Sequence, residues 1–425
     1  MFGLIYGLAH KFLNRCVLII FLLLLSSCTN TKVINSDSNR AEITKDFISI
    51  MDSNPEIKAL TEKSIQKAAE INPDKKTNPV QSLEELYDFL DWCSECMPWE
   101  IIAVSEEYPS IYDQIDQSLD YFYYLFDQPL EELEGKGYYY PTLQYIPEIS
   151  NWCIKYASSW GEYLSTEDSW NDEYFKKVVN SGEFGFAEGW YGYENKWNTF
   201  NEFFARSLIS PDVRPIATSS LVSPADSKPQ GVWKIDDNGD IIQPEGVVIK
   251  SKQFNHVADL IGPDSKYKDS FNGGTLTHTF LDVNDYHGYH FPISGTIVEM
   301  TKIPALDAVG GITEWSEEQS RYVLLSQVFG WQSIETRDCI ILDTEYGLVA
   351  ILPIAMSQVS SCNFSEGLKV GTYVEKGDEL GYFLFGGSDI VMVFQKGVDF
   401  EFLVPEDKNG GYSHILMGEP YANLK

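Results

Sequence analysis

Positive charge is scarce in this sequence. Its 425 residues include 31 lysines and arginines against 63 aspartates and glutamates, which gives a formal net charge of -32 at pH 7. Nucleic-acid binding relies on clustered cations that neutralise phosphates, so this composition argues against a nucleic acid as a partner. It also disfavours electrostatic docking on anionic lipid. Membrane attachment would therefore depend on acyl chains.

Cysteine is also uncommon, with seven in the chain. Cys16 and Cys28 lie near the N-terminus, and the remaining five are an odd number, so at least one cannot form an intrachain disulfide. Cys93 and Cys96 form a C-x-x-C motif, which suits a redox pair or half of a zinc site. No second C-x-x-C or histidine pair lies nearby in the sequence. We therefore interpret these cysteines as structural, with a disulfide between them left open.

A hydrophobic run long enough to cross a bilayer is missing at the N-terminus. The apolar run at residues 16–25 follows a basic stretch and is shorter than the roughly 20 residues that a membrane span needs. It ends in LSSC, and this order of small residues before Cys28 resembles a bacterial lipoprotein signal. We expect residues 1–27 to be the signal peptide and Cys28 to carry the lipid. The alternative is a secretory signal or N-terminal anchor in which Cys28 has no role.

The pattern of the remaining chain divides it into three parts. Residues 28–54 are polar with little periodicity, and we expect a flexible tether there. Residues 55–195 are aromatic-rich with apolar residues at helical spacing, and Ser82 followed by Glu85 fits a capping box. Residues 196–425 contain short strand-like runs separated by turn residues, for example residues 295–298 and 339–342. The predicted fold class is α+β, with a helical N-terminal domain followed by a β-rich domain.

Residues 371–381 place glycines at each bend between β-prone residues. This pattern is similar to the turns of barrel-sandwich domains, the kind found in lipoyl and biotinyl carriers. Lys376 precedes Gly-Asp, and a plain hairpin accounts for it better than a carrier lysine does. We expect the β-rich domain to have barrel-sandwich character without a carrier lysine.

Three blocks in the C-terminal half carry residue types suited to catalysis. They are residues 203–227, which include FFARSL, RPI and SPADS; residues 285–292, which read DYHGYHFP; and residues 376–388, which end in FGGS. The side chains in them that could do chemistry are Asp226, His287, His290 and Ser388.

Each of these residues also has a plainer interpretation. A glycine pair before Ser388 is usually a turn, and Asp226 after Ser-Pro usually stabilises one. His287 and His290 would point to opposite faces of a regular strand, unless Gly288 introduces a bulge or bend. The histidine pair could bind a metal, but no third ligand is apparent, so we expect none.

All three blocks in this order, with about a hundred residues between the histidines and the serine, resemble the phosphatidylserine decarboxylase family. The resemblance covers about residues 196–396. Further pieces at residues 319–322 and 358–362, with the long aromatic N-terminal region, are most similar to the branch of the family that includes fungal tryptophan decarboxylases.

The resemblance implies a self-processing, pyruvoyl-dependent decarboxylase. Ser388 would attack the carbonyl carbon of Gly387, with His290 paired to Asp226 as its base, and the chain would be cut between residues 387 and 388. The small chain would begin with a pyruvoyl group made from Ser388, which draws in the electrons left when carbon dioxide departs. His287 would protonate the α-carbon of the product, because histidine titrates near neutral pH.

Two positions depart from the family pattern. Asp389 stands where a small residue such as threonine is usual, and its charge would oppose the oxyanion that forms during the attack by Ser388. Ser227 stands where glycine usually follows the aspartate. Slow or absent processing is therefore an alternative, and it would leave a binding lipoprotein without catalysis.

The expected partners follow from the resemblance and the N-terminal signal. The substrate is an aminophospholipid, phosphatidylserine, or alternatively a free aromatic amino acid such as tryptophan. The membrane is a partner through the N-terminal lipid anchor, and the cleaved small chain stays with the large one. The expected location is the bacterial cell envelope, facing the periplasm or the exterior.

Overall fold

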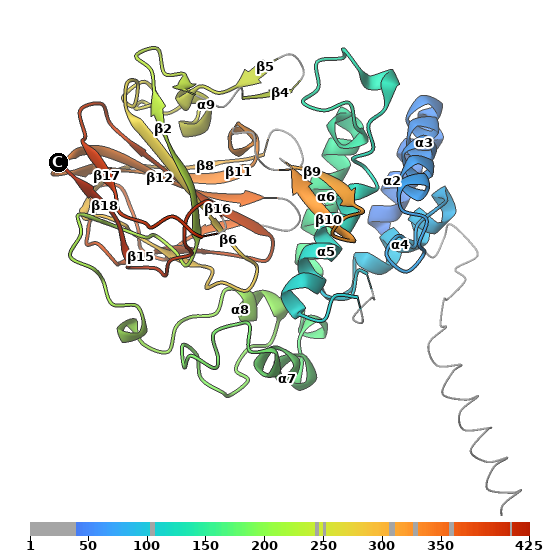
Figure 1. Cartoon of the computed structure of the whole chain (residues 1–425), viewed down its shortest axis with the longest axis horizontal. Helices are drawn as coiled ribbons and strands as arrows, with labels where there is room; N and C mark the ends of the chain where they lie inside the picture. The colour runs from blue at the N-terminus through green and yellow to red at the C-terminus, as the bar shows by residue number, and fades with distance from the viewer. Residues whose placement is uncertain are drawn as a thin grey trace, which may run out of the picture. The chain divides into compact units, whose positions relative to one another are not determined.

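The computed structural model describes residues 40–102, 107–242, 246–249, 252–305, 311–325, 330–356, 361–408 and 410–425. The expected signal peptide and lipidation site at Cys28 lie outside these ranges. Along the chain, helices come first and strands second, and residues 41–425 form one unit. Figure 1 shows helices α2–α7 gathered on one side and the main sheets on the other.

The longer helices occupy the first half of the described chain. They are α2 (Glu42–Ser53), α3 (Pro55–Ile71), α4 (Leu83–Cys93), α5 (Ile111–Tyr124), α6 (Pro147–Tyr163) and α7 (Asp172–Ser181), followed by the short α8 (Phe200–Phe204) and α9 (Val257–Ile261). None of the helices within the described ranges is long and apolar enough to cross a membrane.

Side-chain caps explain where two of these helices begin. The Asn54 side chain accepts a hydrogen bond from the Ile57 backbone N–H, directly before the helix-compatible Pro55 of α3. Ser82 caps α4 by accepting from the Glu85 N–H at 3.2 Å, which confirms the cap predicted there. The Glu85 carboxylate accepts a hydrogen bond from the backbone N–H of Gln81. In a standard capping box it would accept from the N–H of Ser82, so this contact is shifted by one residue.

The flexible tether predicted for residues 28–54 is wrong in its last part, because residues 42–53 form α2. Phe47 and Met51 of α2 are buried, and the centre of the Phe47 ring lies 4.5 Å from the centre of the Trp152 ring in α6. Ile43, Phe47 and Met51 recur every four residues and so form one apolar stripe. The polar residues between them obscure this stripe in the sequence.

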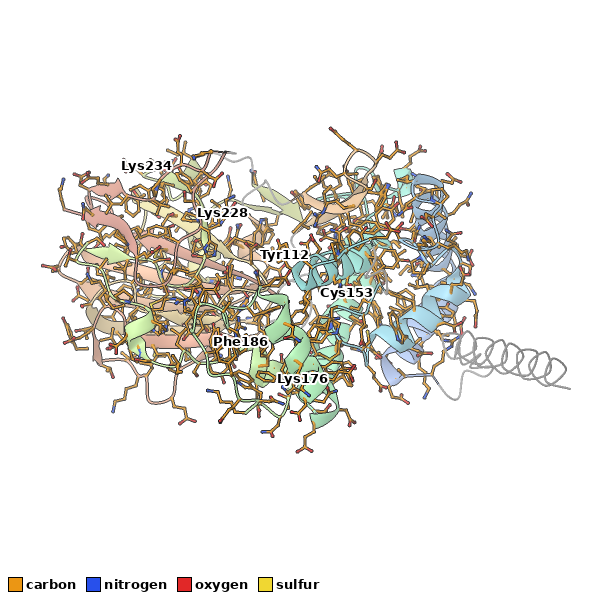
Figure 2. The ribbon with its side chains drawn as sticks, turned by 60° about the horizontal axis from the view of Figure 1, so that its bottom comes forward. Tyr112, Cys153, Lys176, Phe186, Lys228 and Lys234 are labelled. Carbon is orange, nitrogen blue, oxygen red and sulfur yellow. The ribbon has the colours of Figure 1, made fainter. Side chains whose placement is uncertain are left out.

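The aromatic run at residues 121–126 is buried, as its composition predicts. It packs in a core that includes Tyr322 from the β-rich half. Gln117 of α5 exchanges two hydrogen bonds with the backbone of Tyr322, at 2.7 and 2.9 Å. Tyr112 of α5 lies at the same junction (Figure 2) and donates to Asp282 at 3.4 Å. The helices and strands therefore share buried contacts, and the boundary expected between residues 195 and 196 stays a prediction.

The β-rich half is built on one sheet of eight strands in the order β14-β8-β11-β12-β16-β6-β2-β3, and all of its pairings are antiparallel. The strands are β2 (Lys228–Ile235), β3 (Ile241–Ile242), β6 (Thr275–Leu281), β8 (Gly295–Ile303), β11 (Thr336–Thr344), β12 (Gly347–Met356), β14 (Tyr373–Val374) and β16 (Gly387–Phe394). Strands β8 and β11 contain the runs 295–298 and 339–342 that the sequence predicts.

Smaller sheets accompany the large one. They are β1 (Leu221–Val222), β18 (Pro420–Leu424) and β17 (Phe400–Phe402); β13 (Cys362–Phe364), β15 (Glu379–Phe383) and β7 (Gly288–His290); β9 (Ile312–Ser316) with β10 (Arg321–Leu325); and β4 (Val247–Ile249) with β5 (Lys252–Phe254). One hydrophobic core joins a face of the large sheet to the two three-stranded sheets. The α+β prediction is confirmed; the packing is that of a sandwich, and no sheet of the described strands closes into a barrel.

The five cysteines of the described chain are buried, unpaired thiols: Cys93, Cys96, Cys153, Cys339 and Cys362. The prediction of structural cysteines is confirmed, and the disulfide left open for the C-x-x-C motif is not formed. The Tyr156 hydroxyl donates to the Cys93 sulfur at 2.9 Å, and burial raises the pKa of that thiol to about 12. A thiol so protonated at neutral pH is a poor nucleophile, which argues against redox chemistry.

Candidate active site

Ser388 lies at the start of a central strand. It is the second residue of β16, where it pairs with Ala355 of β12 on one side and Leu281 of β6 on the other, and it is fully buried. Gly386 directly before the strand has a φ of +146°, a value that favours glycine. Among the described residues, the Ser388 hydroxyl has only a long contact of 3.5 Å, to the Gly386 carbonyl oxygen. The Gly387–Ser388 bond is thus fixed by the sheet while the hydroxyl is weakly engaged.

Asp226 is held by an arginine that the sequence left without a role. Arg214 from the R-P-I block donates Nε to Oδ1 at 2.9 Å and Nη2 to Oδ2 at 2.5 Å, and both side chains are buried. The Met417 backbone N–H donates to Oδ1 at 2.8 Å. The guanidinium carbon of Arg214 lies 3.9 Å from the ring centre of Trp190. This bidentate pair fixes the carboxylate in one orientation.

His290 is fixed by two partners other than Asp226. Its Nδ1 lies 2.9 Å from the Gly377 carbonyl oxygen, which can only accept, so Nδ1 carries the proton. Its Nε2 then accepts from the Tyr286 hydroxyl at 3.1 Å. Burial lowers the pKa of His290, while the Gly377 carbonyl, the charge of Glu379 and, to a smaller extent, the charge of Asp226 act against this shift. The predicted pairing of Asp226 with His290 therefore takes the form of a nearby charge without a hydrogen bond.

His287 has one open ring nitrogen. Its Nδ1 lies 3.0 Å from the backbone oxygen of Asp285 and donates to it, whereas its buried Nε2 has no partner in the described part of the chain. The ring centre lies 3.9 Å from that of Phe204 in α8. Burial, with a smaller contribution from Arg206, lowers the pKa of His287 to about 3. The near-neutral pKa expected from the sequence is wrong: the imidazole is neutral at pH 7, with a free lone pair on Nε2.

Gly288 separates the two histidines without the bulge proposed for it. The register shift lies in the facing strand β15, between Glu379 and Gly381. Gly288 has another function, because a Cβ at this position would lie 2.1 Å from the Tyr286 hydroxyl oxygen. The missing side chain lets Tyr286 fold back over the strand and reach His290.

The D-Y-H block is also bound by a residue near the C-terminus. His414 Nε2 lies 2.9 and 3.1 Å from the two carboxylate oxygens of Asp285. Burial raises the pKa of Asp285 to about 6, although His414 acts in the opposite direction. The Asp285 backbone oxygen is the acceptor for His287, so His414 supports the residue that orients this histidine.

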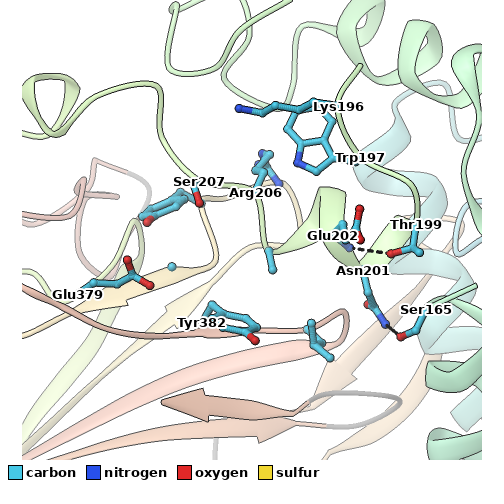
Figure 3. Close-up of a pocket in the computed structure, with 14 residues that line it drawn as sticks. Ser165, Lys196, Trp197, Thr199, Asn201, Glu202, Arg206, Ser207, Glu379 and Tyr382 are labelled. Carbon is cyan, nitrogen blue, oxygen red and sulfur yellow. Dashed lines mark hydrogen bonds between the residues drawn. The ribbon is translucent and has the colours of Figure 1, made fainter. Parts of the chain in front are cut away.

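A pocket of about 590 Å³ opens beside these residues (Figure 3). Lys196 and Arg206 supply positive charge to its lining, and Glu202 and Glu379 supply negative charge. Further lining residues include Trp197, Asn201, Tyr286, Gly288, Tyr382 and Leu384. Tyr286 and Gly288 flank His287, but none of the four predicted catalytic residues lines the pocket itself.

Asn201 connects this pocket to the segment before Ser388. Its side-chain nitrogen donates to the Ser165 hydroxyl at 2.9 Å, and its oxygen accepts from the Phe385 N–H at 3.1 Å. The Phe385 ring in turn packs against Phe204, which also contacts His287. The pocket wall, the histidine and the glycine-serine segment therefore meet around α8.

Comparison with known proteins identifies the family. A family model described as phosphatidylserine decarboxylase matches residues 200–423, which include all four predicted catalytic residues. The chain belongs to the phosphatidylserine decarboxylase family. This is a family of carboxy-lyases.

Curated relatives in this family come from plants and bacteria. The rice (Oryza sativa subsp. japonica) protein named phosphatidylserine decarboxylase proenzyme 2 is 33% identical over 211 residues, which cover 48% of this chain and 31% of the rice protein. Proteins named phosphatidylserine decarboxylase proenzyme are 28% identical in Saccharophagus degradans, over 62% of this chain and 91% of the relative, and 30% identical in Fusobacterium nucleatum, over 64% and 84%.

Within this phosphatidylserine decarboxylase fold, the sequence blocks located the predicted residues but not their partners. Tyr286 and Arg214 belong to blocks already singled out, and their chemistry could have suggested ligands for a histidine and an aspartate. His414 lies outside every block, and its separation of 129 residues from Asp285 left no signal.

Proposed function

We propose that this chain is a proenzyme that cuts itself between Gly387 and Ser388 and then converts phosphatidylserine to phosphatidylethanolamine and carbon dioxide. The observation that carries the proposal is a buried serine with a weakly engaged hydroxyl, preceded by two glycines at the start of a central strand. It lies inside the region that matches the family. The names of the relatives supply the substrate.

The proposed processing is a rearrangement followed by an elimination. The Ser388 hydroxyl oxygen attacks the carbonyl carbon of Gly387 and its proton passes to a base; the peptide C–N bond breaks, leaving an ester and a free amine. Loss of the α-proton of residue 388 then breaks the ester C–O bond, which releases Gly387 as a carboxylate and leaves dehydroalanine. Water hydrolyses this residue with release of ammonia and leaves a pyruvoyl group at position 388.

The proposal keeps His290 as the base for processing. Its ring is fixed by Gly377 and Tyr286, and the charge of Asp226 stabilises the imidazolium that forms when His290 takes the proton. Arg214 restrains Asp226 and so keeps that charge in place. The proton passes from the Ser388 hydroxyl to His290 through the Tyr286 hydroxyl, because this hydroxyl is hydrogen-bonded to His290 Nε2.

Position 388 fits a pyruvoyl group, because it is fully buried and its hydroxyl makes only a long contact of 3.5 Å within the described residues. When present, the pyruvoyl carbonyl supplies a sink for the electrons left as carbon dioxide departs. His287 is neutral and its Nδ1 is committed to Asp285, so only Nε2 can take up a proton and then deliver it. In this proposal a neutral His287 first takes up a proton and then delivers it, whereas the sequence suggested a histidine that is already charged near neutral pH.

The pocket beside α8 is the proposed binding site for the serine headgroup. A phosphatidylserine headgroup carries a phosphate, a carboxylate and an ammonium group, and the lining offers both cations and carboxylates. Lipidation of Cys28 is part of the proposal, and it would keep the enzyme at the envelope membrane that contains its substrate. Neither a free aromatic amino acid nor a role without catalysis is favoured by the family match.

Intact-mass measurement of the purified chain tests the processing step. We expect two chains that separate between residues 387 and 388, with a carbonyl reagent labelling the small one, and a single chain for Ser388→Ala. The cleaved protein is then given phosphatidylserine in detergent micelles or free tryptophan, and carbon dioxide is measured. Release from phosphatidylserine alone supports the proposal. An intact wild-type chain would contradict the processing, and release from tryptophan alone would contradict the substrate.

A further inference from the structure

Asp389 follows the reactive serine in sequence but faces the other side of the sheet. Neighbouring residues of a strand point to opposite faces. Leu281 and Ala355, which pair with Ser388, belong to the hydrophobic core shared with the small sheets. Ile354, which pairs with Asp389, belongs to the core on the opposite face. The carboxylate is therefore directed away from the serine hydroxyl.

The Asp389 carboxylate meets a histidine on that opposite face. His278 of β6 places its Nδ1 3.3 Å from Oδ1 and 3.1 Å from Oδ2 of Asp389. Asp389 is fully buried and His278 is 9% exposed. A buried carboxylate is costly unless it is hydrogen-bonded, and His278 Nδ1 supplies a hydrogen bond to Oδ1.

An indole packs on the histidine of this pair. The Trp233 ring of β2 is stacked on the His278 ring, with the centres 4.9 Å apart and the planes 18° from parallel. Gly231, two residues earlier on the same strand, makes room for the indole, since a Cβ there would lie 2.8 Å from it. Trp233 thus restricts the orientation of His278.

We propose that His278 is a positioning residue for self-processing, which holds the Asp389 carboxylate on the far face of the sheet by donating a hydrogen bond from Nδ1. The inference rests on the proposed cleavage at Ser388. An uncompensated carboxylate next to the Gly387–Ser388 bond would repel the oxyanion that forms when the serine attacks. His278 lets this chain keep an aspartate directly after the reactive serine.

Cleavage time courses of purified precursors test the inference. His278→Phe keeps a ring for Trp233 but loses the nitrogen that faces Asp389, and we expect cleavage to slow at least tenfold. His278→Gln keeps a donor without the ring, and its rate should stay closer to wild type. Asp389→Thr removes the charge, so Asp389→Thr alone and Asp389→Thr with His278→Phe should cleave at the same rate. Circular dichroism of each precursor checks its folding.

The outcomes separate this inference from the proposed function. If wild type cleaves and His278→Phe cleaves equally fast, the inference alone is overturned. If the double variant stays as slow as His278→Phe, then His278 has a purely structural role and the inference also fails. A wild-type chain that never cleaves overturns the proposed function and the inference with it. Rescue by Asp389→Thr supports both.

Discussion

The Tyr286 hydroxyl oxygen lies 3.1 Å from His290 Nε2, and the residue midway between them is a glycine. The geometry depends on that glycine, because a Cβ on Gly288 would lie within 2.1 Å of the same hydroxyl oxygen. The contact between Tyr286 and His290 therefore requires a residue without a side chain at position 288.

Gly288→Ala is expected to displace Tyr286 from His290. The buried site has no space for a methyl group, so we expect a loss of about 1–3 kcal/mol in the free energy of unfolding, together with slower self-cleavage. Urea unfolding in a Ser388→Ala background measures the first effect and a cleavage time course the second. Gly192→Ala is the matched control, because a Cβ there meets nothing within 4 Å. Equal stability of the two variants would contradict the geometry.

His287 should make the protein sensitive to acid. Its folded-state pKa of about 3 is below the ordinary value of 6.5, so the unfolded chain takes up the proton first as the pH falls. The contribution of the neutral His287 ring to the free energy of unfolding is fully present above pH 6.5 and is lost as the pH falls towards 3. At pH 4.5 this linkage amounts to about 2–3 kcal/mol.

His287→Gln should therefore reduce the loss of stability between pH 7.5 and pH 4.5 by about 2–3 kcal/mol. Urea unfolding of the Ser388→Ala chain with and without this change, at both pH values, provides the measurement. His256→Asn is a control at a half-buried histidine, and asparagine can replace its capping contact at the start of α9. An identical pH response in the His287 variant would show that this ring takes up its proton at the same pH in the folded and the unfolded protein.

Local signals predicted the part of this structure that local physics determines. The cap at Ser82, strands β8 and β11 and the order of the three blocks could be read from neighbouring residues. The stripe of α2 was missed because isolated apolar residues in a polar segment show their common face only once Trp152 packs on it. Burial, which lowers the pKa of His287, is likewise a property of the assembled core.

The partners of the predicted residues were missed for a similar reason. His278 lies 111 residues before Asp389 and approaches it only because β6 pairs with β16. The sequence marked Asp389 as an unfavourable neighbour of the serine, and the alternation of the strand removes much of that conflict by directing the two side chains to opposite faces.

Arg214 should be essential for stability through Asp226. Arg214→Ala would leave a fully buried carboxylate without its cation, and we expect a loss of about 3–5 kcal/mol. Arg214→Lys should recover only part of it, because an ammonium group cannot form the bidentate contact. Chemical unfolding of the Ser388→Ala chain measures both variants.

The control for Arg214 is an exposed ion pair in the same half of the chain. Lys396 and Asp237 lie 2.6 Å apart with side chains that are 62% and 77% exposed. Lys396→Ala should change the free energy of unfolding by less than about 1 kcal/mol. A comparable loss for Lys396→Ala and Arg214→Ala would show that burial of the Arg214–Asp226 pair has no special weight.

His414 should affect turnover more than substrate binding. It binds the carboxylate of Asp285, and the backbone oxygen of the same residue orients His287. None of these three residues lines the pocket. His414→Ala should therefore lower kcat for decarboxylation by up to about tenfold, equivalent to about 1.4 kcal/mol, with KM nearly unchanged. His414→Gln retains a donor and should recover most of the rate. A rise in KM at constant kcat would instead place His414 in substrate binding, and a variant that no longer cleaves itself would assign it to processing.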